Sequence, residues 1–240
     1  MLNRNVLAPL PAWLSRWFGY RRIPPPKQPD YIIWTWTFIG AFCCIAVIQA
    51  VFEQAQYFVR RRVPPIVASY GASAVLIYGV IEAPLAQPRA LFGGHFLGAL
   101  VGVIITKLFQ LLPTEERFDQ LSWLAASLSC ATATVVMQIT QTVHPPAGAT
   151  ALLPATSQDI RDIGWYYLPV VLLSSALAFA VALINNNIQR RWPIFWFNPT
   201  QPPPQSKLVK SSAGDDDTKS NSPSTEQERS GNNSNSTAVV

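Results

Sequence analysis

The sequence is poor in charge and in the side chains that build most metal and redox sites. Only 13% of its 240 residues are charged, and it contains three cysteines and two histidines. Cys43, Cys44 and Cys130 all lie in apolar runs, which favours packing over a disulfide framework or a thiolate metal site. Two histidines without a nearby acidic cluster are too few ligands for a metal ion. We therefore expect no metal and no cofactor.

The motifs of the common enzyme classes are missing as well. The apolar part of the chain has no nucleophile elbow, no phosphate-binding glycine loop and no pair of carboxylates, and its one acid is Glu82, at a loop edge. These absences argue against an enzyme. The net charge of +5 does not indicate a nucleic-acid partner, because the arginines flank apolar runs, where they act as topology signals and contact anionic headgroups.

The sequence is rich instead in long uncharged apolar runs. They cover residues 31–52, 63–81, 90–106, 120–143 and 163–189. Because a membrane helix needs about 20 apolar residues, four of these runs can span a bilayer and the second is marginal. We predict an all-α, polytopic membrane protein with four to six crossings that has the lipid bilayer as a partner.

Two short words suggest that the apolar part is an internal duplication. Gly71–Leu76 reads GASAVL and Gly148–Leu153 reads GATALL, identical at four of six positions, and a Pro-Pro pair precedes each. The same 77-residue offset takes Ala90, where one span begins, onto Tyr167, where the last span begins. Chance recurrence of small-residue words is the alternative. Under duplication, each half holds a long span, a short broken or re-entrant element and a second long span.

The stretch 141–156, QTVHPPAGATALLPAT, contains the second of these short elements. Pro145 and Pro146 lack amide donors, so we expect the preceding helix to stop near His144 and Pro154 to interrupt the short element again. Irregular backbone is tolerated at membrane depth only where protein or a water-filled cavity covers it. The pattern therefore predicts a lined site.

A pair of interrupted elements in corresponding positions of two halves is the sequence signature of a transporter binding site. The candidate substrate-binding residues are His144, Pro145, Pro146, Gly148, Thr150, Gly71, Ser73, Arg89 and His95. For His144 we favour function, since ionisable groups inside a membrane are costly; for His95, packing is equally plausible. Ser73 and Thr150 either contribute hydroxyls to the site or bond their own backbone.

Positive charge is expected around the same place. Arg89 either grips a small oxyanion by two-point contact or snorkels to the interface. Short helices starting at Gly71 and Gly148 would direct exposed amide donors to one spot. Separately, Gly94, Gly98 and Gly102 recur every four residues, which predicts a helix face that another helix approaches closely.

These motifs also carry a family resemblance. HPPAGATALL at 144–153, with PLAQPR at 84–89 and GGH at 93–95, resembles the HPP family of integral membrane proteins over roughly residues 60–191. The resemblance implies a multi-spanning membrane protein without an enzymatic domain. Plastid members of that family in plants resemble nitrite transporters, so the resemblance also implies a nitrite-like anion.

We predict a transporter or channel for a small anion, with proton coupling through His144; a non-transporting membrane scaffold is the alternative, and homo-oligomerisation is left open. The expected segments are a basic N-terminal part with interfacial aromatics at 1–30, membrane halves at 31–112 and 121–197, a connector at 113–120 and a disordered tail at 198–240. The distribution of basic residues favours cytosolic termini.

Overall fold

The computed structural model describes residues 11–20, 26 and 28–197, and in that part of the chain every regular element is helical. The predicted disordered tail at 198–240 lies outside the described residues. The elements are α2 (Ala12–Trp17), α3 (Asp30–Gln54), α4 (Gln56–Val59), α5 (Ser69–Ala74), the π-helix η1 (Val75–Gly79), η2 (Pro84–Ala86), α6 (Pro88–Phe109), α7 (Glu115–Ile139), α8 (Pro145–Thr156), α9 (Gln158–Ile163), η3 (Gly164–Tyr166) and α10 (Tyr167–Ile188). The predicted all-α class is confirmed.

Four helical stretches are long and apolar enough to cross a membrane. They are α3, α6, α7 and the continuous stretch Gln158–Ile188, which ends in α10. Large apolar side chains stand exposed on all four, among them Trp34 on α3, Leu108 on α6, Trp123 on α7 and Ile184 on α10. Such surfaces would be unfavourable in water and are stable against lipid tails. The protein is therefore an integral membrane protein in contact with the bilayer.

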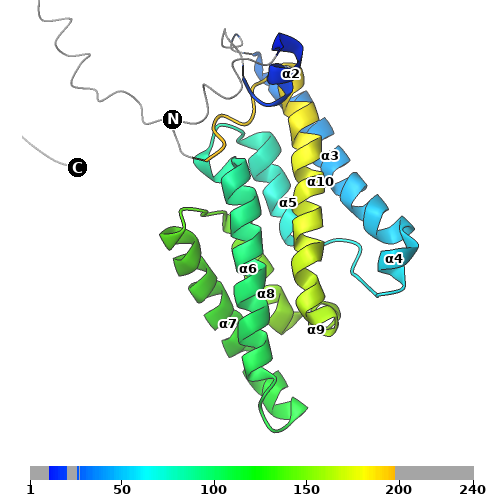
Figure 1. Ribbon diagram of the computed structural model, residues 1–240, viewed down its shortest axis with the longest axis vertical. Coiled ribbons are helices and arrows are strands. Elements are labelled where there is room, and N and C mark those ends of the chain that lie inside the picture. The colour runs from blue at the N-terminus through cyan, green and yellow to red at the C-terminus, as the bar shows by residue number, and fades with distance from the viewer. Residues whose placement is uncertain (1–10, 21–25, 27, 198–240) are drawn as a thin grey trace, which may run out of the picture. The chain divides into compact units, whose positions relative to one another are not determined.

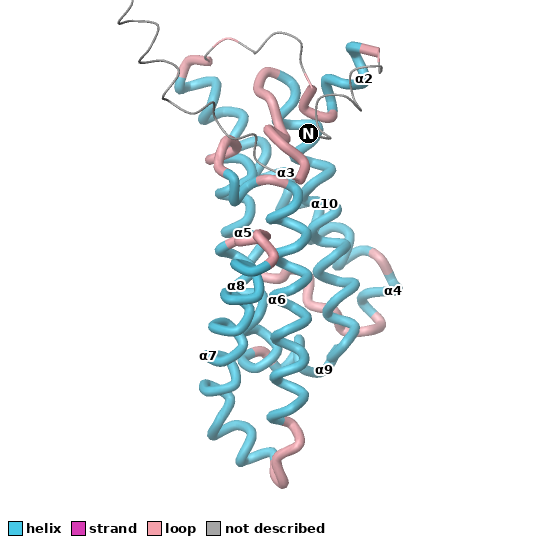
Figure 2. Tube along the Cα trace, turned by 60° about the vertical axis from the view of Figure 1, so that its left-hand side comes forward, coloured by secondary structure: helices cyan, strands magenta, loops and turns pink. Residues whose placement is uncertain are grey.

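The long helices pack in a fixed order around α6. Figure 1 shows α6 between α7 and α10, with α3 on the other side of α10. Helix α6 contacts both α7 and α10, and α10 contacts α3. The short helix α8 packs against both α6 and α7 and also touches α5. Figure 2 shows α5, α6 and α8 side by side. The two short helices are therefore held next to one another by the long ones.

Side-chain contacts define two ends of the helical core. At the first end, the Trp36 indole near the start of α3 donates to Gln189 after α10, at 2.8 Å, and Arg89 at the start of α6 donates to the carbonyl of Thr140 after α7, at 2.6 Å. At the second end, Arg161 of α9 pairs with Asp119 near the start of α7 at 3.4 Å. There the ring of Tyr57, after α3, also lies 6.4 Å from the ring of Tyr166, before α10.

These contacts give the direction of each element. Helices α3 and α6 run from the first end to the second, and α7 and α10 run back. The segment with α5 and η1 returns the chain to the first end, and α8 with α9 returns it to the second. The order long, short, long thus occurs twice, and each element of one half runs opposite to its counterpart in the other. This order and these directions are those of two halves arranged as an inverted repeat.

The short helices begin and end at other residues than expected. Helix α5 begins at Ser69 and α8 at Pro145, so the expected starts at Gly71 and Gly148 were wrong, and both glycines lie inside helices. Proline is favoured at the first helical position, where no intrahelical donor is needed. The Pro-Pro pair of α8 therefore starts the helix, with His144 as its N-cap.

Pro154 does not interrupt α8, contrary to expectation. The helix continues to Thr156. A proline inside a helix removes the amide that would bond the carbonyl four residues earlier, here that of Thr150. The hydroxyl of Tyr167 donates to this carbonyl at 3.2 Å, so the lost bond is replaced from α10. The expected connector at 113–120 is also mostly helical, since α7 begins at Glu115.

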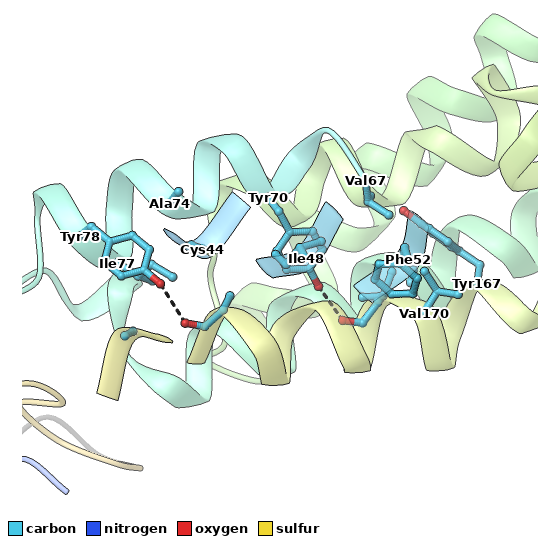
Figure 3. Packing of buried hydrophobic residues seen from close by; sticks show 14 of the residues in the cluster. Cys44, Ile48, Phe52, Val67, Tyr70, Ala74, Ile77, Tyr78, Tyr167 and Val170 are labelled. Carbon is cyan, nitrogen blue, oxygen red and sulfur yellow. Dashed lines mark hydrogen bonds between the residues drawn. The ribbon is translucent and has the colours of Figure 1, made fainter. Parts of the chain in front are cut away.

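The π-helix η1 is stabilised in the same way, by polar side chains of α10 and the residues just after it. The Asn186 amide donates to the carbonyl of Ile77 at 2.7 Å, and Arg190 donates to the carbonyl of Tyr78 at 3.0 Å. Buried carbonyls require such partners, since each unpaired one costs about 1–3 kcal/mol. Hydrogen bonds also join α5 and η1 to α10 in the opposite sense. Figure 3 shows the hydroxyls of Tyr70 and Tyr78 pointing at the backbone of α10, where they donate to carbonyl oxygens.

The glycine face of α6 is confirmed as a packing surface. A Cβ added at Gly98 would lie 2.5 Å from the carbonyl oxygen of Ala147 on α8, and one at Gly94 would lie 2.6 Å from the Cβ of His144. Gly102 faces Ala151 in the same manner. Contacts this short show that α6 and α8 approach one another at van der Waals distance. The glycines thereby bring His144 next to the residue that follows Gly94, which is His95.

Candidate functional site

Four polar side chains meet in the interior where α5, α6 and α8 come together. Ser73 of α5, His95 of α6, His144 at the N-cap of α8 and Thr150 of α8 are each 0% exposed. Buried polar atoms are stable only when they are hydrogen-bonded. All four side chains bond to one another, so they form one connected network.

His95 is the centre of this network. Its Nε2 lies 2.7 Å from Oγ of Ser73, and its Nδ1 lies 2.8 Å from Oγ1 of Thr150. Ser73 and Thr150 are the pair that the 77-residue offset matches across the two halves. One imidazole therefore joins equivalent hydroxyls of the two inverted halves, one on each ring nitrogen.

His144 extends the network toward the first end. Its Nε2 lies 3.0 Å from Oγ of Ser73, and its Nδ1 donates to the carbonyl of Leu85 at 2.8 Å. The two imidazole rings are 4.9 Å apart, centroid to centroid. Both histidines therefore share the Ser73 hydroxyl. A proton on either ring is within two hydrogen bonds of the other.

Three further residues belong to the site and were missed by sequence reasoning. Oγ of Ser69 lies 2.7 Å from Oγ1 of Thr150, and the ring of Tyr70 stacks on His95 at 4.4 Å. Tyr167 reaches the Thr150 backbone. One signal was available: Ser69 precedes Ser73 by four residues, so the two share a helix face.

The other predicted residues lie outside the network. Arg89 donates to the carbonyls of Phe197 and Thr140, which ties the start of α6 to two neighbouring segments. Gly71 is exposed, with open space where a Cβ would stand, and Gly148 lies against Cys130 of α7. None of them hydrogen-bonds to the two histidines.

Pro145 and Pro146 act through the backbone. They occupy the first two positions of α8, which places His144 at the helix N-cap in an extended conformation. From that position Nδ1 of the imidazole reaches the carbonyl of Leu85. The prolines therefore position His144 and contribute no polar atom of their own to the network.

The site is rich in hydrogen-bond donors and has no carboxylate. Every aspartate and glutamate that the structure describes is exposed, and none bonds to the network. Two imidazoles and three hydroxyls each offer a donor and an acceptor, and either imidazole gains a positive charge by binding a proton. A buried site of this composition favours an anion over a cation once it is protonated.

Comparison with known proteins identifies the family. Residues 26–193 match the family described as HPP, transmembrane region, which is well over half of the chain. The chain belongs to the HPP family. The matched region contains the whole network, from Ser69 to Thr150, and all four long helical stretches.

Two curated relatives of this HPP chain are transmembrane proteins of Dictyostelium discoideum. Each is 36% identical over 188 residues, which is 77% of this chain and 63% of one relative and 57% of the other. The chain thus spans about 60% of the length of these relatives. No solved structure matches the chain.

Proposed function

We propose that this HPP protein moves a small monovalent anion of the nitrite type across a membrane, and that it is not an enzyme. The observation that carries the proposal is the buried network of Ser73, His95, His144 and Thr150. It combines protonatable rings with hydroxyl donors and no carboxylate. In such a site a protonated imidazole supplies the positive charge and the hydroxyls supply short, directed hydrogen bonds to oxygen atoms of the anion.

The position of the network supports transport over a purely structural role. In transporters built from inverted repeats, the binding site lies at the interface of the repeats and is formed by interrupted helices. Here Ser73 comes from the short element of the first half and Thr150 from that of the second. A site shared by two halves can open to either side when one half moves against the other.

In the arrangement observed, the polar side chains of the network hydrogen-bond to one another. An anion enters by replacing these internal bonds with bonds to its own oxygens. We infer that α5 and α8 separate to admit it, because the bonds that join these two helices, Ser69 to Thr150 and Ser73 to His144, are among those that the anion replaces. The tight α6–α8 interface, with no side chain on its glycines, stays closed.

Anion uptake into proteoliposomes tests the proposal. Liposomes containing the purified wild-type protein are expected to take up nitrite faster than protein-free liposomes, and faster than they take up chloride, because a spherical ion makes fewer directed hydrogen bonds. Nitrate and formate are planar oxyanions like nitrite, so their rates of uptake show how closely the site selects among such anions. Absence of flux for all four anions would favour a non-transporting scaffold. Flux of a cation or a neutral solute with the same protein would contradict the electrostatic argument.

A further inference from the structure

The order of hydrogens in the buried network follows from one fixed acceptor. A carbonyl oxygen only accepts, so Nδ1 of His144 carries the hydrogen that it shares with Leu85. In the neutral imidazole the other nitrogen is then bare, and Nε2 of His144 accepts. Its partner at 3.0 Å is Oγ of Ser73, which therefore donates. The one hydrogen of the Ser73 hydroxyl is now assigned.

The same logic continues through the second histidine. Since the Ser73 hydrogen points at His144, Nε2 of His95 is the donor in its 2.7 Å bond to Ser73. Nδ1 of the neutral His95 is then bare and accepts from the Thr150 hydroxyl. Thr150 in turn accepts from the hydroxyl of Ser69. Every hydrogen bond in the network runs in one direction, from Ser69 to Leu85.

The network has room for one added proton. Oγ of Ser73 also lies 3.3 Å from the carbonyl oxygen of Ser69, a contact that the neutral order leaves unused. When Nε2 of His144 binds a proton, the Ser73 hydroxyl turns to this carbonyl and accepts from His144 and His95 at once. One proton and one positive charge are gained, no covalent bond breaks, and no heavy atom has to move.

His95 has no nitrogen that can bind the added proton as easily. A proton on its Nδ1 would point at Oγ1 of Thr150, whose own hydrogen would then have to turn to Ser69. The Ser69 hydroxyl would lose its acceptor in turn, so two hydroxyls must reorient instead of one. We therefore propose that the network is a binding site for a single proton, with Nε2 of His144 as the receiving atom and the Ser73 hydroxyl as the group that turns to accommodate it.

Neighbouring titratable groups are engaged elsewhere. Tyr70 of α5 donates to the carbonyl of Val171, and Tyr167 of α10 donates to the carbonyl of Thr150. On α7, Cys130 lies beside Gly148, and Arg89 of α6 bonds to backbone carbonyls at the first end. No carboxylate bonds to either histidine among the described residues. The added charge is therefore compensated by the network itself, or by an anion that enters with it.

Nitrogen-15 NMR of the full chain tests this inference directly, because the chain has two histidines. The protein is labelled on the histidine rings and measured in lipid without any transported anion, so the result does not depend on the proposed transport. At high pH we expect opposite tautomers, with hydrogen on Nδ1 of His144 and on Nε2 of His95. The His144→Gln variant leaves one ring and assigns both sets of signals.

On acidification, the wild-type His144 ring is expected to gain its second hydrogen while His95 remains a neutral Nε2–H tautomer. Ser73→Ala should abolish the fixed tautomer of His95, and Ser73→Thr, which keeps the hydroxyl, should preserve it. The same tautomer on both rings, or double protonation of His95 before His144, would overturn the proposal. The tautomers and the order of protonation are read from the wild-type protein, so a Ser73 variant that fails to fold does not affect them.

Discussion

Proteoliposomes with the His144→Gln variant are expected to take up nitrite roughly ten- to a hundredfold more slowly than wild type. Glutamine keeps a polar side chain at the N-cap of α8 but binds no proton, so the site loses its positive charge and one charged hydrogen bond. A hydrogen bond to a charged group contributes about 1.5–3 kcal/mol, and about 1.4 kcal/mol corresponds to tenfold. The measurement is the initial rate of uptake at equal protein incorporation.

The matched control is Thr134→Val on α7. The Thr134 hydroxyl bonds to the carbonyl of Cys130 in its own helix and is exposed on the surface of the described core. Its removal should leave uptake unchanged, which separates loss of the site from a general effect of altering a polar residue in a membrane helix. A His144→Gln protein that folds and transports at the wild-type rate would remove His144 from the site.

His95→Ala is expected to destabilise the protein by about 3–5 kcal/mol. The substitution empties the volume of a fully buried ring and removes the stacking partner of Tyr70. It also takes away the acceptor of the Thr150 hydroxyl, and an unsatisfied buried donor costs about 1–3 kcal/mol, whereas Ser73 keeps its bond to His144. The measurement is the unfolding midpoint of the purified protein in detergent.

The comparison for this variant is Trp123→Ala. Trp123 is 64% exposed on α7, so its truncation removes a large side chain without opening a buried cavity, and the midpoint should change little. If the unfolding midpoint of His95→Ala were as high as that of Trp123→Ala, the hydrogen bonds of the imidazole would contribute little to stability. The account of His95 as the group that joins the two halves would then be wrong.

Much of the fold could be predicted from the sequence, because the signals were long and periodic. The four spans follow from apolar length, and the close contact of α6 with α8 follows from Gly94, Gly98 and Gly102 at four-residue spacing. The matched positions of Ser73 and Thr150 in two short words predicted that both would lie in one site. Sequence repetition carries this information because equivalent positions of two halves meet at their interface.

The helix boundaries could not be predicted, because they depend on partners far away in the sequence. Pro154 was expected to end α8, and the helix continues because Tyr167 supplies the missing donor. The directions of the helices also required the structure, since a charge distribution alone does not distinguish inverted from parallel halves.

Arg89 and His95 show a second limit of prediction from the sequence. The sequence placed an arginine next to the motif and left open whether it grips an anion or snorkels to the interface; in the structure its guanidinium reaches the carbonyls of Phe197 and Thr140. Conversely, His95 was equally compatible with packing and with function, and it is the residue that bonds to both halves. Which polar groups meet is decided by helix rotation, and the local sequence does not encode that.

The most direct measurement of the central account is a nitrite titration of the ring-labelled protein followed by nitrogen-15 NMR at a pH where His144 is protonated. The network is predicted to be the anion site, so nitrite should shift the His144 and His95 ring signals saturably, and the double variant Ser73→Ala, Thr150→Val should weaken the apparent affinity at least about tenfold. Ring signals that stay unchanged up to nitrite concentrations that saturate uptake would contradict it, since the anion would then bind elsewhere.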